Sequence, residues 1–279
     1  MVSQLVPLSI RGVNYYPRET SWAGLWTKTE PETWRGDLAL AASLGVNTVR
    51  TFLHFGAKQK EGGLLAEGGE PTPAYLDKME AFFTAAWASG IRAIPCFEFD
   101  GAALSDSSAG SKWRRGMEGV LARFKEDGRI LMWDLMNEPD DGKKWGSNTV
   151  RYLDEAGALC ERLDPRRLTT IGFAYRTDRL SQLSLPDVLQ WHEYAPKPEL
   201  FAMGPARVLK SLTNQVKVGG VRPVFIGEFG MSTGRDPRFG ADPSLTNKLQ
   251  PSAGTEAEQE RLYSIILAAA EEARMPGVL

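Results

Sequence analysis

Short apolar runs alternate with longer amphipathic segments along the whole sequence, and this alternation constrains the fold more than any other feature. Seven runs rich in β-branched and apolar residues predict strands, at 8–14, 46–53, 91–97, 130–136, 168–173, 188–192 and 223–229. Parallel strands need long connections between them, usually helices. The sequence therefore predicts an α/β fold made of repeated strand–helix units.

The segments between the runs carry apolar residues at helical spacing, so each can bury one face against a sheet. The predicted buried faces are Leu76, Met79, Phe83 and Ala86; Trp113, Met117, Val120 and Phe124; Tyr152, Ala156, Leu159 and Leu163; and Leu262, Ile265, Ile266 and Ala269. No linker or shift in composition divides the chain, so we expect residues 1–279 to form a single domain.

Two architectures fit the alternation: a closed barrel and an open, doubly wound sheet. The turn after the first predicted strand, at 12–26, lacks the glycine spacing that brings backbone amides close to a pyrophosphate in doubly wound folds. The chain is also somewhat longer than the roughly 250 residues typical of an eight-stranded barrel. The prediction is a (β/α)8 TIM barrel.

The eighth strand of this barrel is cut short or incomplete, because the sequence after the last helical segment reads MPGVL and stops at Leu279. Either 277–279 closes the barrel as a stub, or the natural protein continues and the barrel edge is open. An open edge presents unpaired backbone groups to other chains. Self-association through that edge is therefore one hypothesis.

Composition argues against several classes of partner. The 33 basic and 35 acidic residues leave a formal net charge of −2, which gives no electrostatic attraction for nucleic acid or an anionic membrane. No stretch approaches the roughly 18 apolar residues of a membrane helix, and the first residues lack a signal-peptide pattern. We expect a soluble protein, either cytoplasmic or secreted with its signal removed.

Motifs for metal ions, cofactors and a nucleophilic serine are missing from the sequence. The two histidines, His54 and His192, and the two cysteines have no metal-binding spacing, and there is no Gly-x-Ser-x-Gly sequence. We therefore expect no metal and no cofactor, and a serine hydrolase is disfavoured.

Polar and charged residues gather at the predicted strand ends, where a barrel of this kind carries its reactive groups. They are Asn14, Tyr15, Arg50, His54, Glu98, Asp100, Asn137, Glu138, His192, Tyr194 and Glu228. Such side chains are costly to bury in an apolar core, so a shared polar cleft at the barrel mouth explains them better.

Glu138 and Glu228 end the fourth and seventh predicted strands, which lie across the barrel mouth from each other. Two facing carboxylates can cleave a glycosidic bond when one is protonated and donates to the leaving oxygen while the other is ionised and attacks the anomeric carbon. Retention of configuration requires a separation of about 5 to 5.5 Å.

Five motifs in order resemble those of a known family: RGVNYYP at 11–17, LGVNTVRTF at 44–52, WDLMNEP at 133–139, WHEYAP at 191–196 and VFIGEFG at 224–230. They are similar to the motifs of retaining glycoside hydrolases of clan A, most nearly glycoside hydrolase family 5. The resemblance implies double displacement on a β-linked glucan, mannan or related glycoside, with an oligosaccharide or polysaccharide as partner.

The resemblance also implies a role for each matching residue. Glu138 would be the acid/base and Glu228 the nucleophile. Asn137 would bind the sugar 2-hydroxyl next to the reacting carbon.

Three further residues would support these carboxylates in the same family pattern. Arg50 would keep Glu228 ionised and oriented, since a nearby cation lowers a carboxyl pKa. Tyr194 would donate to the same carboxylate, and His192 would lie beside Glu138 and tune it. His54 is left out of this catalytic set.

Substrate contacts are expected from Asn14, Tyr15, Glu98 and Asp100, and from the loop tryptophans Trp26 and Trp145, with Trp22 as a further one. The family often has a histidine at the end of the third strand, where this chain reads PCFEFD, so Glu98 or Asp100 would make the sugar contacts there. A flat aromatic face can stack on a pyranose ring.

Two alternatives remain open at this stage. The family carries a sugar-binding tryptophan on its eighth strand, and the sequence ends before any such residue. The chain could thus be a catalytically impaired glycan-binding barrel, or a fragment that needs a missing C-terminal segment. A transglycosylase, in which a sugar hydroxyl replaces water as acceptor, would have the same sequence pattern.

Overall fold

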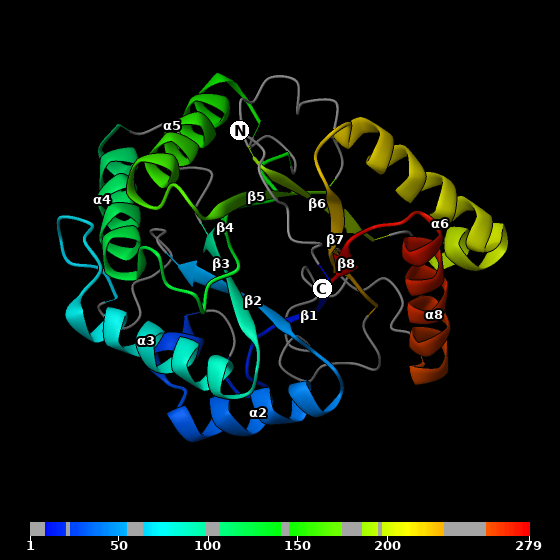
Figure 1. Ribbon diagram of the computed structural model, residues 1–279, viewed down its shortest axis with the longest axis horizontal. Helices are drawn as coiled ribbons and strands as arrows, with labels where there is room; N and C mark the ends of the chain where they lie inside the picture. Colours follow the sequence, from blue (N-terminus) through cyan, green and yellow to red (C-terminus); the bar gives the residue numbers. More distant parts are fainter. Residues whose placement is uncertain are drawn as a thin grey trace, which may run out of the picture.

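The computed structural model shows a barrel of parallel strands surrounded by helices (Figure 1). It describes residues 9–20, 23–54, 64–98, 107–140, 145–174, 186–194, 197–231 and 255–279. All statements below refer to these residues.

Eight parallel strands close into one barrel in sequence order, as predicted. They are β1 (Ile10–Asn14), β2 (Thr48–His54), β3 (Arg92–Glu98), β4 (Met132–Asn137), β5 (Leu168–Phe173), β6 (Val188–Glu193), β7 (Val224–Phe229) and β8 (Gly277–Val278). The first seven coincide with the seven apolar runs. Because all strands run in the same direction, their carboxyl ends meet at one mouth.

Helices form a ring outside the barrel (Figure 1). They are α1 (Gly24–Thr27), α2 (Pro31–Ser43), α3 (Pro73–Ala88), α4 (Ser107–Phe124), α5 (Ser147–Leu163), α6 (Lys197–Gly219) and α8 (Glu256–Glu272). The faces predicted for α3, α4, α5 and α8 pack against the barrel in the main core, with Leu76 and Leu163 only partly buried there. A capping box at Thr255 and Glu258 begins α8 and satisfies backbone amides that would otherwise lack partners.

A second, smaller apolar cluster fills the end of the barrel interior opposite the mouth. This base cluster consists of Ile10, Ile94, Met132, Val188, Phe225 and Leu279. Ile94 is the Cα partner of Arg50 in the neighbouring strand, so both side chains face the same side of the sheet. The barrel interior therefore changes from apolar at its base to charged towards its mouth.

The two-residue β8 closes the barrel as a stub. Gly277 and Val278 pair with Ile10 and Arg11 of β1, and Val278 also pairs with Ile226 of β7. A side chain at position 277 would collide with the backbone of Ile10, so glycine permits this close approach. The expectation of self-association rested on an open edge, and the eight described strands leave no such edge between β7 and β1.

No helix in the described parts of the chain is long and apolar enough to cross a membrane.

Candidate active site

The carboxyl ends of β1, β2, β4, β6 and β7 bring polar side chains together around one arginine. Arg50, on β2, is fully buried, and all five of its N–H groups meet an acceptor. Its Nη1 donates to Asn14 Oδ1 at 2.9 Å and to Glu228 Oε1 at 2.6 Å. Its Nη2 donates to Asn137 Oδ1 at 2.8 Å and to Cys96 Sγ at 3.5 Å.

The fifth N–H of Arg50, on Nε, donates to Asp134 Oδ2 at 2.7 Å, and Asp134 is as completely buried as the arginine. Burial alone would lower the pKa of Arg50, but the negative charges of Asp134 and Glu228 outweigh it and hold that pKa well above its ordinary value. The guanidinium also lies 4.5 Å from the centre of the Phe52 ring, which favours a cation. Arg50 is thus a rigid, permanently charged support.

Glu228, at the end of β7, is held in its ionised form. Burial would raise the pKa of Glu228, but the charges of His192 and Arg50, together with hydrogen bonds from Arg50 and Tyr194, lower it below the ordinary value. Its other oxygen, Oε2, accepts a bond from Tyr194 Oη at 3.1 Å. An ionised, fixed carboxylate is suited to nucleophilic attack.

Tyr194 follows β6 and is 57% exposed, unlike the buried Arg50, Asp134 and His192. Partial burial of its hydroxyl and the charge of Glu228 raise its pKa, so the phenol stays protonated and remains a donor. Tyr194 therefore links the buried network to solvent at the mouth.

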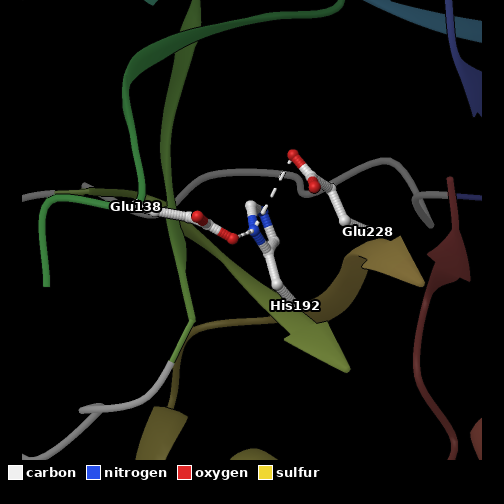
Figure 2. Close-up of side chains that lie close together, drawn as sticks. All are labelled: Glu138, His192 and Glu228. Atoms are coloured by element: carbon white, nitrogen blue, oxygen red, sulfur yellow. Dashed lines mark hydrogen bonds and ion pairs between the residues drawn. The ribbon is translucent and has the colours of Figure 1, made fainter. Parts of the chain in front are cut away.

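Glu138 and Glu228 approach the same histidine from different strands (Figure 2). His192 Nδ1 lies 2.8 Å from Glu138 Oε1 and 3.7 Å from Glu228 Oε1. The histidine nitrogen and one oxygen of each carboxylate all lie within 4.8 Å of one another. This spacing between carboxylates is close to the short separation of retaining enzymes and well below the roughly 6.5–9.5 Å of inverting ones.

Gly172 of β5 makes room for the imidazole of His192. A side chain at position 172 would collide with Nε2 and Cε1 of that ring. His192 is 1% exposed and pairs through its backbone with Glu228 at an irregularity in the β6–β7 register. The backbone of three strands therefore fixes the position of the ring.

Glu138, His192 and Glu228 are also the group of described residues whose ligand atoms are close enough to share a metal ion. Arg50, however, places a fixed positive charge 2.6 Å from Glu228 Oε1, and like charges repel strongly in a buried site. The arrangement favours carboxylate chemistry over cation binding, and the expectation of a metal-free site stays a prediction.

Two residues predicted to contact substrate do not lie in this cluster, and those predictions are wrong for this structure. Tyr15 faces the helices, stacking on Phe82 and donating to Asp37 Oδ2 at 2.8 Å. Trp26 is 1% exposed and donates to the carbonyl of Phe52 at 2.8 Å, inside the aromatic core beneath α2 and α3. Neither ring has a face available to a sugar.

The other residues predicted to contact substrate lie in several different places. Trp145 is half-buried and packs near Phe173, outside the arginine network. Glu98 ends β3 opposite His54 in register, while Asp100 and Trp22 lie outside the described residues. Asn14 lies in the cluster, where it links Arg50 to the carbonyl of Gly227, to which its Nδ2 donates at 2.8 Å. Its contact with substrate stays a prediction.

His54, left out of the catalytic set, lies at the mouth end of β2 and makes none of the contacts with the two glutamates described above. It is 2% exposed, and burial lowers its pKa to about 4, so it is neutral at neutral pH. Its Nε2 lies 3.5 Å from the hydroxyl of Tyr16.

Sequence reasoning missed Asp134 and Cys96 as partners of Arg50. An acidic residue inside the apolar run 130–136 was the available signal, since an unpaired buried carboxylate is rarely tolerated. Cys96 gave no comparable signal because a buried thiol is common in cores.

The family model for cellulase, glycosyl hydrolase family 5, matches residues 9–250. The chain belongs to this family, and its barrel is therefore a glycosidase domain. A sequence comparison with curated proteins gives no match.

Solved structures of low sequence identity share the fold. The exo-β-1,4-mannosidase Op5Man5 from Opitutaceae bacterium strain TAV5 is 17% identical with a TM-score of 0.73, over 98% of this chain and 51% of that chain. This chain thus spans about half the length of that mannosidase. A family 5 mannosidase from Rhizomucor miehei is 15% identical, with a TM-score of 0.71 over 97% of this chain and 80% of that one. Thermotoga maritima Cel5A, in complex with cellobiose, has the same identity and TM-score over 97% and 89%.

Proposed function

We propose that this protein is a retaining β-glycoside hydrolase in which Glu228 is the nucleophile and Glu138 the acid/base. The observation that carries the proposal is a pair of carboxylates with one oxygen of each within 4.8 Å of the other, and Arg50 and Tyr194 keep one of the pair ionised. Glu228 is therefore held in the form that double displacement requires of its nucleophile.

In the first step a Glu228 oxygen attacks the anomeric carbon and forms an ester bond to the sugar. The bond from that carbon to the leaving oxygen breaks, and Glu138 supplies the proton that neutralises the leaving group. In the second step Glu138, now a carboxylate, removes a proton from water. The hydroxide oxygen then replaces Glu228 at the anomeric carbon, which restores both residues.

The neighbours of these carboxylates have supporting roles in the proposal. Because Oδ1 of Asn137 accepts from Arg50, its amide NH2 is the part left to donate to the sugar 2-hydroxyl. His192 lies between the two carboxylates and interacts with whichever of them is ionised. Their precise placement matters because catalysis depends on interactions that strengthen in the transition state.

For the substrate we propose a β-linked glucan, mannan or related glycoside. This choice is supported by the names of the structural neighbours, which include mannosidases and a protein solved with cellobiose. Those likenesses are of similar strength for both kinds of neighbour, so the proposal does not choose between glucose and mannose.

Product stereochemistry and azide rescue test this mechanism. NMR during hydrolysis of an aryl β-glycoside should show the β-anomer as the first product. With an activated aryl glycoside, Glu138→Ala should be rescued by azide to give a β-glycosyl azide, because azide needs no general base. The matched variant Glu228→Ala should give an α-glycosyl azide or none. The α-anomer as first product from the unaltered protein, or glycan binding with no turnover of any β-glycoside, would overturn the proposal.

A further inference from the structure

The short segment that carries Glu138 has an unusual backbone. Its φ of 44° puts Glu138 in the left-handed region, which non-glycine residues rarely occupy. The next residue is Pro139, which restricts the conformation of the residue before it still further. Such a conformation persists only when surrounding contacts determine it.

The strand before this segment prepares the same turn. On β4 the register slips between Asp134 and Asn137, so that three steps on β4 match two steps on β5, from Thr170 to Gly172. An extra residue of this kind bends the strand and redirects the side chains that follow. The bend delivers Asn137 to Arg50 and leaves Glu138 at the turn.

Two hydrogen bonds then tie the segment to the end of β5. The amide of Glu138 donates to the carbonyl of Gly172 at 3.0 Å, and the amide of Ala174 donates to Asp140 Oδ1 at 3.0 Å. Asp140 is only 3% exposed, so this charge-assisted bond forms away from competing water. The bonds lie on either side of Pro139 and connect the segment to two residues at the end of β5, Gly172 and Ala174.

We propose that Asp140 is a positioning residue that holds the Glu138 carboxylate in place for proton transfer. This inference rests on the proposed function of Glu138 as the acid/base. The carboxylate of Asp140 fixes the far end of the turn, so the left-handed backbone of Glu138 cannot relax and its side chain stays against His192. In this proposal Asp140 positions Glu138 and transfers no proton to substrate.

Leaving-group dependence distinguishes this role from a merely structural one. A poor leaving group needs the proton from Glu138 as its bond breaks, whereas a good one departs without it. Displacing the acid by about 1 Å can cost roughly 10²-fold. Asp140→Ala should therefore lower kcat/KM about 10- to 100-fold for aryl β-glycosides with poor leaving groups and change it little for a dinitrophenyl glycoside.

Asp140→Asn is the matched control, since its amide oxygen can still accept from Ala174 and should restore most of the lost rate. Thermal unfolding of both variants reports on the fold, and amide exchange at Ala174 should speed up in Asp140→Ala whether or not substrate is present. An equal loss for all leaving groups, or no loss with unchanged exchange, would overturn the inference.

Glu138→Ala, measured on the same series, separates the two proposals. If it shows the steep leaving-group dependence and Asp140→Ala does not, the inference about Asp140 fails alone. If Glu138→Ala itself shows no such dependence, the proposed acid/base fails and the positioning role fails with it.

Discussion

The same strands build both ends of the barrel interior, but different interactions hold the two ends together. At the base, the six apolar residues of the base cluster pack together, and their stabilisation comes from surface removed from water. At the mouth, fully buried Arg50 and Asp134 and the nearly buried Glu228 form a charged network. Such a network stabilises little overall, because desolvation offsets most of the attraction between the charges.

Strand β4 shows the contrast within six residues. Met132 belongs to the base cluster, Asp134 binds Arg50, and Asn137 at the end of the strand binds Arg50 as well. The base cluster therefore contributes mainly to the stability of the barrel, and the charged network at the mouth contributes mainly to its chemistry. The contrast predicts that changes at the two ends affect stability and activity differently.

The largest effect is expected from Arg50→Met, which should break the network at the mouth. The variant leaves Asp134 as an uncompensated buried charge, so the free energy of unfolding should fall by about 3–5 kcal/mol and activity should fall with it. Denaturant unfolding and kcat/KM measure the two effects. The double variant Arg50→Met with Asp134→Leu should recover most of the stability but not the activity. A double variant as unstable as Arg50→Met alone would contradict the account.

Phe225→Ala should weaken the base alone. Removing a fully buried ring from a packed cluster should lower the free energy of unfolding by about 3–5 kcal/mol. Activity per folded molecule, measured well below the unfolding temperature, should stay near that of the unaltered protein. A large loss of kcat with an unchanged KM would mean that the two ends are coupled.

His54, near the mouth, should make the free energy of unfolding depend on pH. Its pKa is about 4 when folded against an ordinary 6.5, so the unfolded chain binds the proton more tightly between these values. The stability is fully present above about pH 6.5 and is lost as the pH falls towards 4, by on the order of 3 kcal/mol. His54→Asn should flatten this part of the curve of unfolding free energy against pH, and an unchanged slope would refute the assignment.

Tyr194→Phe should have the smallest effect, because the hydroxyl is one of several groups acting on Glu228. Losing the bond to Oε2 raises the pKa of Glu228, so the acid limb of the kcat/KM profile should move to higher pH. We expect a loss of about 10-fold at the optimum, the scale of one charged hydrogen bond. Tyr152→Phe, on α5 outside the barrel, is the control and should leave the profile unchanged.

The sequence was sufficient to predict the barrel because apolar runs mark the first seven strands and apolar residues at helical spacing mark α3, α4, α5 and α8. It also placed Arg50, Asn137, Glu138, His192, Tyr194 and Glu228 at strand ends, and the structure brings these six together. It could not separate Asn14 from Tyr15, which are adjacent and therefore point to opposite faces of the strand. The direction of β1 relative to the barrel axis decides which of them faces inward.

The sequence pattern did not predict the directions of loop side chains or the pairing of residues far apart in the sequence. Trp26 belongs to a four-residue helix whose packing against Trp34, Tyr75 and Phe82 sets its direction, and composition does not reveal that packing. Asp134 was recognisable as a polar residue in an apolar run, but its partner lies 84 residues away. The sequence left open whether 277–279 closes the barrel, because a two-residue strand does not reveal its pairing with β1 and β7.

Covalent trapping tests the central claim most directly. The protein would be incubated with 2-deoxy-2-fluoro β-glycosides of the gluco and manno series, which slow the breakdown of a glycosyl-enzyme by destabilising its transition state. Intact-protein mass should rise by one fluorosugar, and peptide mapping should place the label on Glu228. A label on another residue, or no label in a preparation that hydrolyses the parent glycoside, would contradict the assignment of Glu228 as the nucleophile.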